Sequence, residues 1–205
     1  MLGYYDYTVL ATYASLAVSV LGVFFAWDGA TLSAVLCLML SGFLDCFDGK
    51  IARTKKNRSD GGKRFGIQID SLCDLVCFGV LPVAVCRSAG LSRGWFTLIG
   101  AAYILCALIR LAYFNVTEEE RQATTSERRH FYMGLPVTSI ALTLPAVYLL
   151  RQVSMDALRL GLAILLAVTA ALFITPLRIP KFHKAGVVGL VLLGLAEGIL
   201  LHICR

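Results

Sequence analysis

Four aspartates stand in two closely spaced pairs within a part of the sequence that is otherwise mostly apolar. Asp45 and Asp48 are three residues apart, and Asp70 and Asp74 are four residues apart. Both spacings place the two carboxylates of a pair on one face of a helix. If the flanking apolar runs are membrane helices, such carboxylates are costly, and they persist mainly where they meet a partner, a cavity or an ion. The two pairs therefore predict a functional site shared by two helices.

The donor atoms of the aspartates indicate which ion such a site would hold. Four carboxylates at close range would repel one another unless cations enter the site. With oxygen ligands alone, Mg²⁺ or Mn²⁺ is the natural choice, and two such ions would balance four carboxylates. Cys73 and Cys77 fall near the same helical face as Asp70 and Asp74, so a thiolate zinc site is a geometrical alternative. No histidine joins them in the sequence, which favours the oxygen-bound ions.

Small residues and one arginine accompany the acids. Gly42, Gly49, Ala52 and Gly66 remove bulk where helices must approach closely or where a phosphate must touch the backbone. Helix packing alone would also explain them. Arg53, one turn after Gly49, can offer a forked and permanent cation to phosphate oxygens. Alternatively, Arg53 could anchor the helix end on the cytoplasmic side of a membrane, where basic residues concentrate.

Composition and hydropathy identify the elements that must position these residues. The hydrophobic fraction is 58% and only 16% of residues are charged, against roughly 25% charged residues in a soluble domain. Apolar runs near 20 residues recur, and a helix of that length crosses the roughly 30 Å hydrocarbon layer. The runs lie at about 7–27, 30–45, 66–87, 95–115, 135–150, 157–175 and 185–204. We therefore predict one all-α domain over residues 1–205, a polytopic bundle of six to seven transmembrane helices.

The distribution of Lys and Arg predicts how this bundle sits in a membrane, because these residues concentrate in cytoplasmic loops. If the loop after the second run is cytoplasmic, most of the 19 Lys and Arg residues fall on the cytoplasmic side. The remainder are Arg87, Arg93, Arg151, Arg159 and Arg205. We therefore expect a multi-pass plasma-membrane protein with a cytoplasmic N-terminus and a site on the cytoplasmic side. An odd number of spans would place the C-terminus outside.

Two polar stretches connect the apolar runs near the acids. Residues 50–65 contain a Ser-Asp-Gly-Gly turn signal at 59–62, which joins the second and third runs as antiparallel neighbours. All four carboxylates can then converge on one pocket. The second stretch, residues 116–130, is expected to be a cytoplasmic loop or a short surface helix.

The net charge of +6 could suggest a nucleic-acid partner, but the positions of the basic residues favour another interpretation. The basic residues sit beside apolar runs, where anionic lipid headgroups attract them, so membrane lipids are expected as partners and nucleic acid is not. The seven cysteines are an odd number and lie mostly within apolar runs. They are interpreted as small buried core residues rather than a disulfide framework.

The acidic stretch resembles the signature of the CDP-alcohol phosphotransferase family. The matching positions are Asp45, Asp48-Gly49, Ala52-Arg53, Gly66, Asp70 and Asp74. Twelve residues separate Arg53 from Gly66, several more than is usual in the family. We expect the extra length to form a longer surface loop at residues 60–62 that preserves both helix faces.

This resemblance implies a transfer without a covalent enzyme intermediate, in which an acceptor hydroxyl attacks the lipid-side phosphorus of a CDP-lipid and CMP leaves. It implies metal-ligand roles for Asp45, Asp48 and Asp70. Asp74 would be both a ligand and the general base, and two Mg²⁺ or Mn²⁺ ions would stabilise the developing charge. The nucleotide- and phosphate-binding positions would be Asp48, Gly49, Ala52, Arg53 and Gly66. The resemblance also implies a homodimer.

Further segments are similar to the phosphatidylserine synthase branch of the family. They are residues 70–76, 78–82, 110–116 and 131–136. The branch implies CDP-diacylglycerol as donor, L-serine as acceptor, and phosphatidylserine and CMP as products. The acceptor-binding residues would be Ser71, Arg110, Asn115, Arg128 and Arg129.

Two sets of alternatives stay open at the level of sequence. Glycerol-phosphate and inositol-phosphate acceptors would need basic groups similar to those for serine, and Arg110 and Asn115 could be a helix-end anchor and cap. A cation-coupled transporter is the alternative from another class, since membrane carboxylates also mark ion pathways. Transporter sites usually lie near the bilayer midplane within repeated halves, and no repeat is visible in this sequence.

Overall fold

The computed structural model describes residues 3, 7–52, 54, 59–92, 94–124, 131–180 and 184–203 of the chain. Nearly all of these residues are helical, in the order η1 (Tyr7–Val9), α1 (Leu10–Trp27), α2 (Thr31–Ala52), α3 (Asp60–Asp74), η2 (Leu75–Val80), α4 (Leu81–Ser88), α5 (Gly94–Thr124), η3 (Val137–Ser139), α6 (Ile140–Tyr148), η4 (Leu149–Gln152), α7 (Met155–Ile174) and α8 (Lys184–Ile203). Two short strands are described, β1 (Phe131–Met133) and β2 (Arg178–Pro180). The predicted helical class is confirmed.

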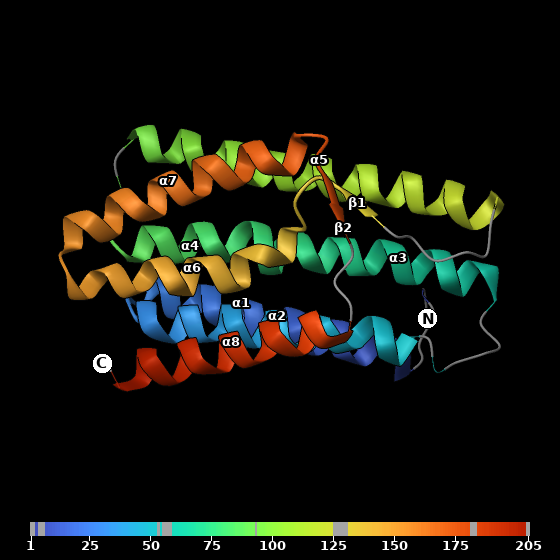
Figure 1. Ribbon diagram of the computed structural model, residues 1–205, viewed down its shortest axis with the longest axis horizontal. Coiled ribbons are helices and arrows are strands. Elements are labelled where there is room, and N and C mark those ends of the chain that lie inside the picture. The colour runs from blue at the N-terminus through green and yellow to red at the C-terminus, as the bar shows by residue number, and fades with distance from the viewer. Residues whose placement is uncertain are drawn as a thin grey trace.

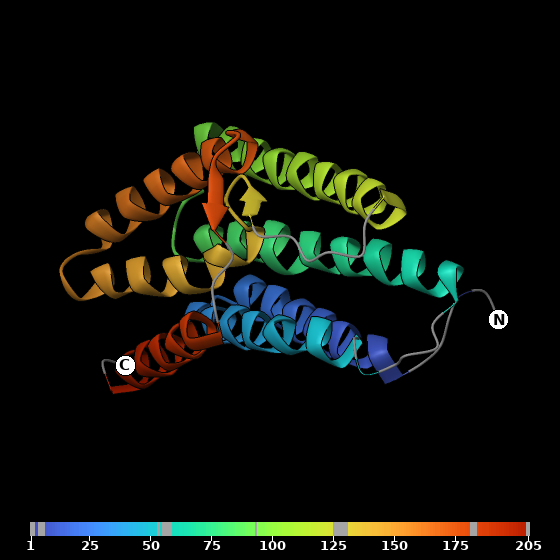
Figure 2. The same cartoon turned by 45° about the vertical axis from the view of Figure 1, so that its right-hand side comes forward.

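The helices lie roughly along one direction in three layers (Figure 1). α5 and α7 form one outer layer, the continuous rod α3–η2–α4 lies with α6 in the middle, and α1, α2 and α8 form the other outer layer. The turned view in Figure 2 shows the same layers.

Among the described residues, four helices are long and apolar enough to cross a membrane, at Leu10–Trp27, Asp60–Ser88, Gly94–Arg121 and Met155–Ile174. In the part of the chain that the structure describes, the apolar segments Thr31–Phe47 of α2 and Val191–Leu201 of α8 are shorter. The architecture is that of a multi-pass helical membrane protein. The count of six to seven spans and the cytoplasmic N-terminus stay predictions.

Contacts near the helix ends show which segments share an end of the bundle. The hydroxyls of Tyr7 and Thr54 lie 3.0 Å apart at one end. At the other end, the hydroxyls of Thr31 and Ser88 lie 2.7 Å apart. α1, α2 and the segment from α3 to α4 therefore alternate in direction, as a chain that crosses a membrane repeatedly requires.

Helix α3 begins earlier than predicted because Ser59 caps it. The Ser59 hydroxyl accepts a hydrogen bond from the Gly62 N–H at 3.1 Å, and Asp60 pairs with Lys63 at 3.0 Å in the first turn. Both features stabilise a helix N-terminus. Residues 60–62 are therefore helical, and the predicted longer surface loop at this place is wrong. Helix α2 also continues to Ala52, beyond residue 45 where the predicted run ends.

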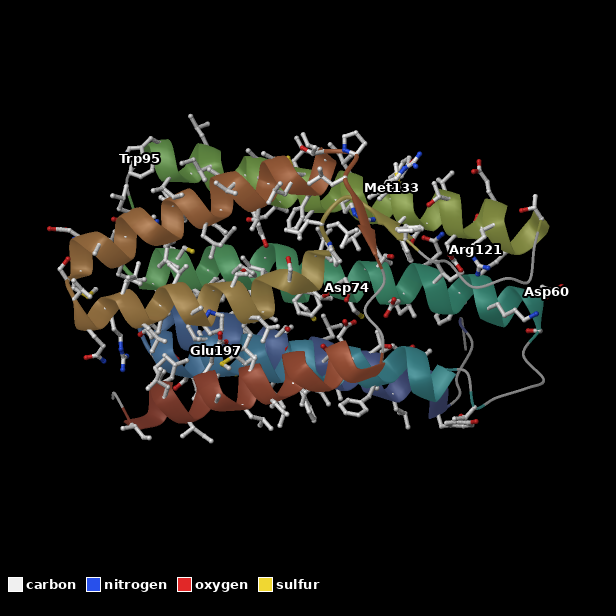
Figure 3. The ribbon with its side chains drawn as sticks, viewed as in Figure 1. Asp60, Asp74, Trp95, Arg121, Met133 and Glu197 are labelled. Atoms are coloured by element: carbon white, nitrogen blue, oxygen red, sulfur yellow. The ribbon has the colours of Figure 1, made fainter. Side chains whose placement is uncertain are left out.

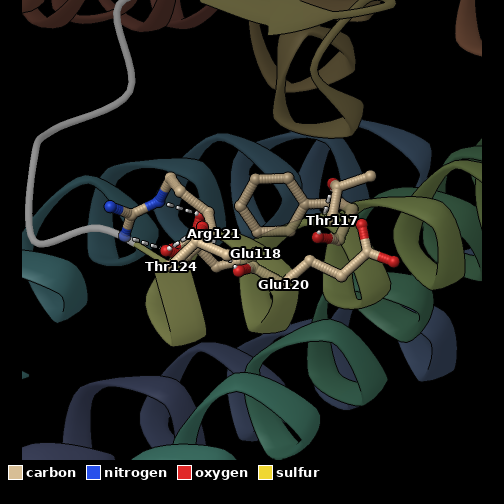
Figure 4. A network of polar contacts seen from close by, with 6 residues as sticks. Thr117, Glu118, Glu120, Arg121 and Thr124 are labelled. Carbon is tan, nitrogen blue, oxygen red and sulfur yellow. Dashed lines mark hydrogen bonds and ion pairs between the residues drawn. The ribbon is translucent and has the colours of Figure 1, made fainter.

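Helix α5 extends through most of the second polar stretch. Residues 116–124 continue the helix, in place of the predicted loop or separate surface helix, and residues 125–130 lie outside the described part. Figure 4 shows polar contacts in its last turns: Arg121 Nε donates to Glu118 Oε2 at 3.1 Å, and the Thr124 hydroxyl donates to the Glu120 carbonyl oxygen at 3.0 Å. Contacts three and four residues apart stabilise this polar helix end.

The rod that carries two of the aspartates changes its winding directly after Asp74. Residues Leu75–Val80 form a π-helical segment, and Pro82 follows in the first turn of α4. Proline has no N–H to donate, and its ring displaces the carbonyl four residues earlier, which here is that of Phe78. The Tyr103 hydroxyl of α5 donates to this carbonyl oxygen at 2.7 Å. Tyr103 thus satisfies a buried acceptor and ties α5 to the rod.

The strands β1 and β2 join the segments that follow α5 and α7 (Figure 2). They pair antiparallel, with Tyr132 opposite Ile179. Gly134 follows β1 with a φ of +78°, and its N–H donates to the Leu177 carbonyl oxygen at 2.7 Å. A Cβ at this position would lie 2.8 Å from the Phe173 carbonyl oxygen, so glycine is required here. The sequence did not predict this ribbon.

We expect Tyr103→Phe to lower the free energy of unfolding by about 1–3 kcal/mol, because it removes the partner of the buried Phe78 carbonyl. Unfolding in mixed detergent micelles, followed by circular dichroism, measures the change. Tyr113→Phe is the matched control on the same helix, where the side chain is 52% exposed, and it should leave stability unchanged. Equal stability of the two variants would contradict the role assigned to Tyr103.

Candidate metal centre

Three of the four predicted aspartates meet between α2 and the rod. One carboxylate oxygen from each of Asp45, Asp70 and Asp74 lies within 4.8 Å of the others. All three residues are half-buried. Figure 3 shows Asp74 inside the bundle, well along the rod from Asp60 at its start. Oxygen donors at this spacing suit a hard divalent cation such as Mg²⁺ or Mn²⁺, which would offset the repulsion among the carboxylates.

Serine hydroxyls fix the rotation of α2 so that Asp45 faces the rod. Ser41 lies four residues before Asp45, on the same face of the helix. Its hydroxyl lies 2.7 Å from that of Ser19 and donates to the Ser15 carbonyl oxygen at 3.2 Å. The Ser15 hydroxyl donates in return to the Ser41 carbonyl oxygen at 3.2 Å. Such contacts between small polar residues are a main source of helix association in membranes, where burying apolar surface between helices contributes little.

Two further close approaches hold α1 and α2 against their neighbours. The Ser15 hydroxyl lies 3.6 Å from the Cys77 sulfur, which is three residues after Asp74 on the rod. On α2, a Cβ at Gly42 would lie only 2.5 Å from the Cβ of Ala141 on α6. Gly42 therefore serves helix packing, which was one of the two interpretations open for it.

The zinc alternative is not supported by the described part of the chain. There, the group of side chains that could hold a metal ion consists of aspartates and includes neither Cys73 nor Cys77. Both cysteines are buried, and Cys77 lies against α1. A donor set of carboxylate oxygens favours hard cations over zinc.

The nucleotide- and phosphate-binding positions are described only in part. Asp48, Gly49 and Ala52 lie in the last turns of α2, and the structure describes their backbone but not their side-chain surroundings. Gly66 lies in α3, one turn before Asp70, and is half-buried. The predictions for Arg53, Arg128 and Arg129 fall outside the described residues.

Two of the predicted acceptor-binding residues, one on α3 and one on α5, are in direct contact. The Ser71 hydroxyl donates to Asn115 Oδ1 at 2.7 Å, and Asn115 is only 7% exposed. Arg110 is equally buried, and its guanidinium carbon lies 5.8 Å from the centroid of the Phe114 ring. Because α5 continues to Thr124, Arg110 and Asn115 lie well inside the helix. The alternative of a helix-end anchor and cap is therefore wrong.

Two residues that the sequence analysis missed continue this polar contact. Asn115 Nδ2 donates to Gln68 Oε1 at 3.1 Å, and Gln68 Nε2 donates to Glu119 Oε1 at 3.3 Å. Gln68 is three residues before Ser71, and Glu119 is four residues after Asn115. Matching polar spacings on two helices were the available signal, but they did not reveal that the helices are neighbours.

Comparison with protein families identifies the family of the chain. Residues 8–177 match the CDP-alcohol phosphatidyltransferase family. The chain belongs to this family.

Individual relatives are similar over part of their length. The chain is 37% identical over 118 residues to the CDP-diacylglycerol–serine O-phosphatidyltransferase of Saccharomyces cerevisiae. This alignment covers 56% of this chain and 41% of the yeast protein. It is 30% identical over 167 residues to the archaetidylserine synthase of Methanothermobacter thermautotrophicus, with 81% and 66% covered. It is 28% identical over 188 residues to the CDP-diacylglycerol–serine O-phosphatidyltransferase of Helicobacter pylori, with 88% and 74% covered. The chain thus spans less than two thirds of the yeast and archaeal proteins.

We expect Mn²⁺ or Mg²⁺ to stabilise the protein, by about 2.7 kcal/mol at a hundred times the dissociation constant. Asp45→Asn and Asp70→Asn should remove most of this stabilisation. Each substitution also removes one of the mutually repelling charges, so it should lower the repulsion within the cluster in the absence of metal. Thermal unfolding with and without metal measures both effects.

An electron paramagnetic resonance titration with Mn²⁺ measures binding directly. Asp156→Asn is the matched control, because this aspartate is 94% exposed near the other end of the bundle, and it should bind Mn²⁺ like the wild type. Normal Mn²⁺ binding by both cluster variants would contradict the assignment of a metal centre.

Proposed function

We propose that this chain transfers the phosphatidyl group of CDP-diacylglycerol to the hydroxyl of L-serine, releasing CMP and forming phosphatidylserine. The observation that carries the proposal is the group of three converging aspartates in a chain of the CDP-alcohol phosphatidyltransferase family. Relatives named serine O-phosphatidyltransferase and archaetidylserine synthase favour serine as the acceptor.

The proposed metal ligands are Asp45, Asp48, Asp70 and Asp74, which would hold two Mg²⁺ or Mn²⁺ ions. When bound, these ions supply positive charge to the pyrophosphate of the donor and to the departing CMP. Arg53 adds a permanent cation for phosphate oxygens. Gly49, Ala52 and Gly66 leave room for the nucleotide and its phosphates to approach the helix backbone.

The proposed reaction is one in-line displacement. The serine hydroxyl oxygen forms a bond to the lipid-side phosphorus while the bond from that phosphorus to CMP breaks, and CMP leaves with the electron pair. Asp74 accepts the hydroxyl proton at a carboxylate oxygen. Its place at the junction of α3 and the π-helical segment supports this role, since such segments are frequent at functional sites.

The acceptor is proposed to bind between α3 and α5. Ser71 and Asn115 lie together there, and Ser71 directly follows Asp70 on the rod. The carboxylate of serine needs a cation, for which Arg110, Arg128 and Arg129 are the candidates. Glycerol-phosphate or inositol-phosphate acceptors would use the same chemistry and similar cations.

We further propose six to seven spans in the plasma membrane, with the N-terminus and the aspartate cluster toward the cytoplasm. The crowding of Lys and Arg in the sequence between α2 and α3 supports this orientation. A homodimer is proposed from the family resemblance alone.

Purified protein given CDP-diacylglycerol, Mg²⁺ or Mn²⁺ and labelled serine should release CMP and form labelled lipid in equal amounts. Separate reactions with glycerol phosphate and inositol phosphate test the acceptor. CMP release with one of these but not with serine would preserve the reaction class and overturn the choice of acceptor. No CMP release with any acceptor would favour a transporter instead.

Asp74→Asn should lower kcat by about 10²- to 10⁴-fold, the usual contribution of a general base. The variant should keep its fold and bind CDP-diacylglycerol within several-fold of the wild type, since a neutral amide of the same shape replaces one charge. Steady-state kinetics and nucleotide binding separate the two effects, with Asp156→Asn as control. A fully active Asp74→Asn protein would remove Asp74 as the base.

A further inference from the structure

A continuous chain of four polar side chains links α3 and α5 beside the aspartate cluster. Gln68 Nε2 donates to Glu119 Oε1 at 3.3 Å, Asn115 Nδ2 donates to Gln68 Oε1 at 3.1 Å, and the Ser71 hydroxyl donates to Asn115 Oδ1 at 2.7 Å. Glu119 and Gln68 at one end of this hydrogen-bond chain are exposed, Asn115 is buried, and Ser71 at the other end is half-buried. Ser71 follows Asp70 and lies one turn before Asp74, so this hydrogen-bond chain ends next to two residues of the candidate metal centre along the rod.

The chemistry of Glu119 gives this chain of hydrogen bonds one direction. An ionised carboxylate only accepts hydrogen bonds, so Gln68 must turn its amino group toward Glu119 and its carbonyl oxygen toward Asn115. Asn115 must then turn its amino group toward Gln68 and its carbonyl oxygen toward Ser71. Each step leaves the next residue one orientation, and the burial of Asn115 strengthens the preference.

The last step fixes the chemistry of Ser71. A hydroxyl has one proton to donate and two lone pairs that accept. Because the Ser71 proton is donated to Asn115, Ser71 can offer only lone pairs to a bound substrate. A group recognised by Ser71 must therefore be a hydrogen-bond donor.

We propose that Gln68 and Glu119 are positioning residues that hold Ser71 as a hydrogen-bond acceptor for the ammonium group of an amino-alcohol substrate. This inference rests on the proposed function. Of the groups on serine, the hydroxyl gives its proton to the base and the carboxylate requires a cation. The ammonium remains, and a half-buried ammonium requires acceptor oxygens to replace its water.

Gln68→Met tests the role of the hydrogen-bonded side chains, because methionine has a similar length and forms no comparable hydrogen bonds. The Asn115 amide and the Ser71 hydroxyl then become free to reorient. We expect KM for serine to rise about 10-fold, the typical effect of losing one hydrogen bond to a charged group. KM for CDP-diacylglycerol should change less than about two-fold, because the donor is proposed to bind at the aspartates rather than at these four hydrogen-bonded side chains.

A substrate analogue without the ammonium separates recognition from general damage. The analogue is 3-hydroxypropionate, used as a competitive inhibitor against serine. Its inhibition constant should change less than about two-fold in Gln68→Met, whereas a distorted site would weaken the analogue and serine alike. A parallel loss for both ligands, or an unchanged KM for serine, would overturn the proposal.

Variants at Glu119, the exposed end of the hydrogen-bonded series, provide a second test if Gln68→Met folds poorly. Glu119→Leu removes the acceptor that sets the direction and should raise KM for serine, whereas Glu119→Gln keeps an acceptor oxygen and should recover most of the affinity. Thr117→Val is the matched control on α5, because the Thr117 hydroxyl donates to the Tyr113 carbonyl oxygen of its own helix at 3.0 Å. Equal kinetics of Glu119→Leu and Thr117→Val would overturn the proposal.

The outcomes for the two proposals are distinct. A wild-type protein that releases no CMP with serine refutes the proposed function. A wild-type protein that uses serine normally, with variants at Gln68 and Glu119 that do so equally well, refutes only the positioning role.

Discussion

The structure depends on holding three carboxylates within 4.8 Å of one another among apolar helices. Their mutual repulsion favours separation of α2 from α3 unless a cation is present, so helix packing must hold the two elements together. This packing lies about one helical turn from the acids. Ser41, four residues before Asp45, forms reciprocal hydrogen bonds with Ser15. Ser15 also contacts Cys77, three residues after Asp74. One buried serine on α1 therefore contacts both helices that carry the acids. This explains why α1, which contributes no acid to the described cluster, is needed for the geometry of the site.

The rod is fixed to α5 at two heights, and the two contacts have different purposes. Tyr103 satisfies the Phe78 carbonyl near Pro82, where the helix cannot bond to itself in the usual way. Twelve residues further along α5, or about 18 Å of helix, Asn115 accepts the Ser71 hydroxyl. The first contact compensates for the winding change that follows Asp74, and the second joins the face that carries Asp70 to the polar end of α5. α5 therefore cannot rotate relative to the rod without breaking one of these two hydrogen bonds.

The sequence predicted the acids, their helical faces and the helical class, because these depend on spacing and hydropathy alone. It misjudged where helices begin and end near the site. The cap formed by Ser59 makes Asp60–Gly62 helical although two glycines favour a turn, and such local competition is not visible in composition. The contact of Gln68 with Asn115 was not found for another reason. Periodicity assigns a residue to a face of its own helix, but the identity of the neighbouring helix depends on the packing of the whole bundle.

The position of the cluster along α2 suits a reaction between one lipid and one water-soluble substrate. Phe43 and Phe47, two residues before and after Asp45, are 40% and 37% exposed and contact each other on the side of the helix away from the acid. At this level along its length, α2 thus has aromatic side chains on its outer face and a carboxylate on the face toward the bundle interior. Beyond this height, α3 and α5 become polar, from Gln68 back to Asp60 and from Asn115 on to Thr124. For the proposed reaction, the acyl chains of the donor can stay beside apolar helix surface while its phosphates reach the acids. Serine can then enter from the polar side, past Glu119 and Gln68, without crossing the hydrocarbon layer.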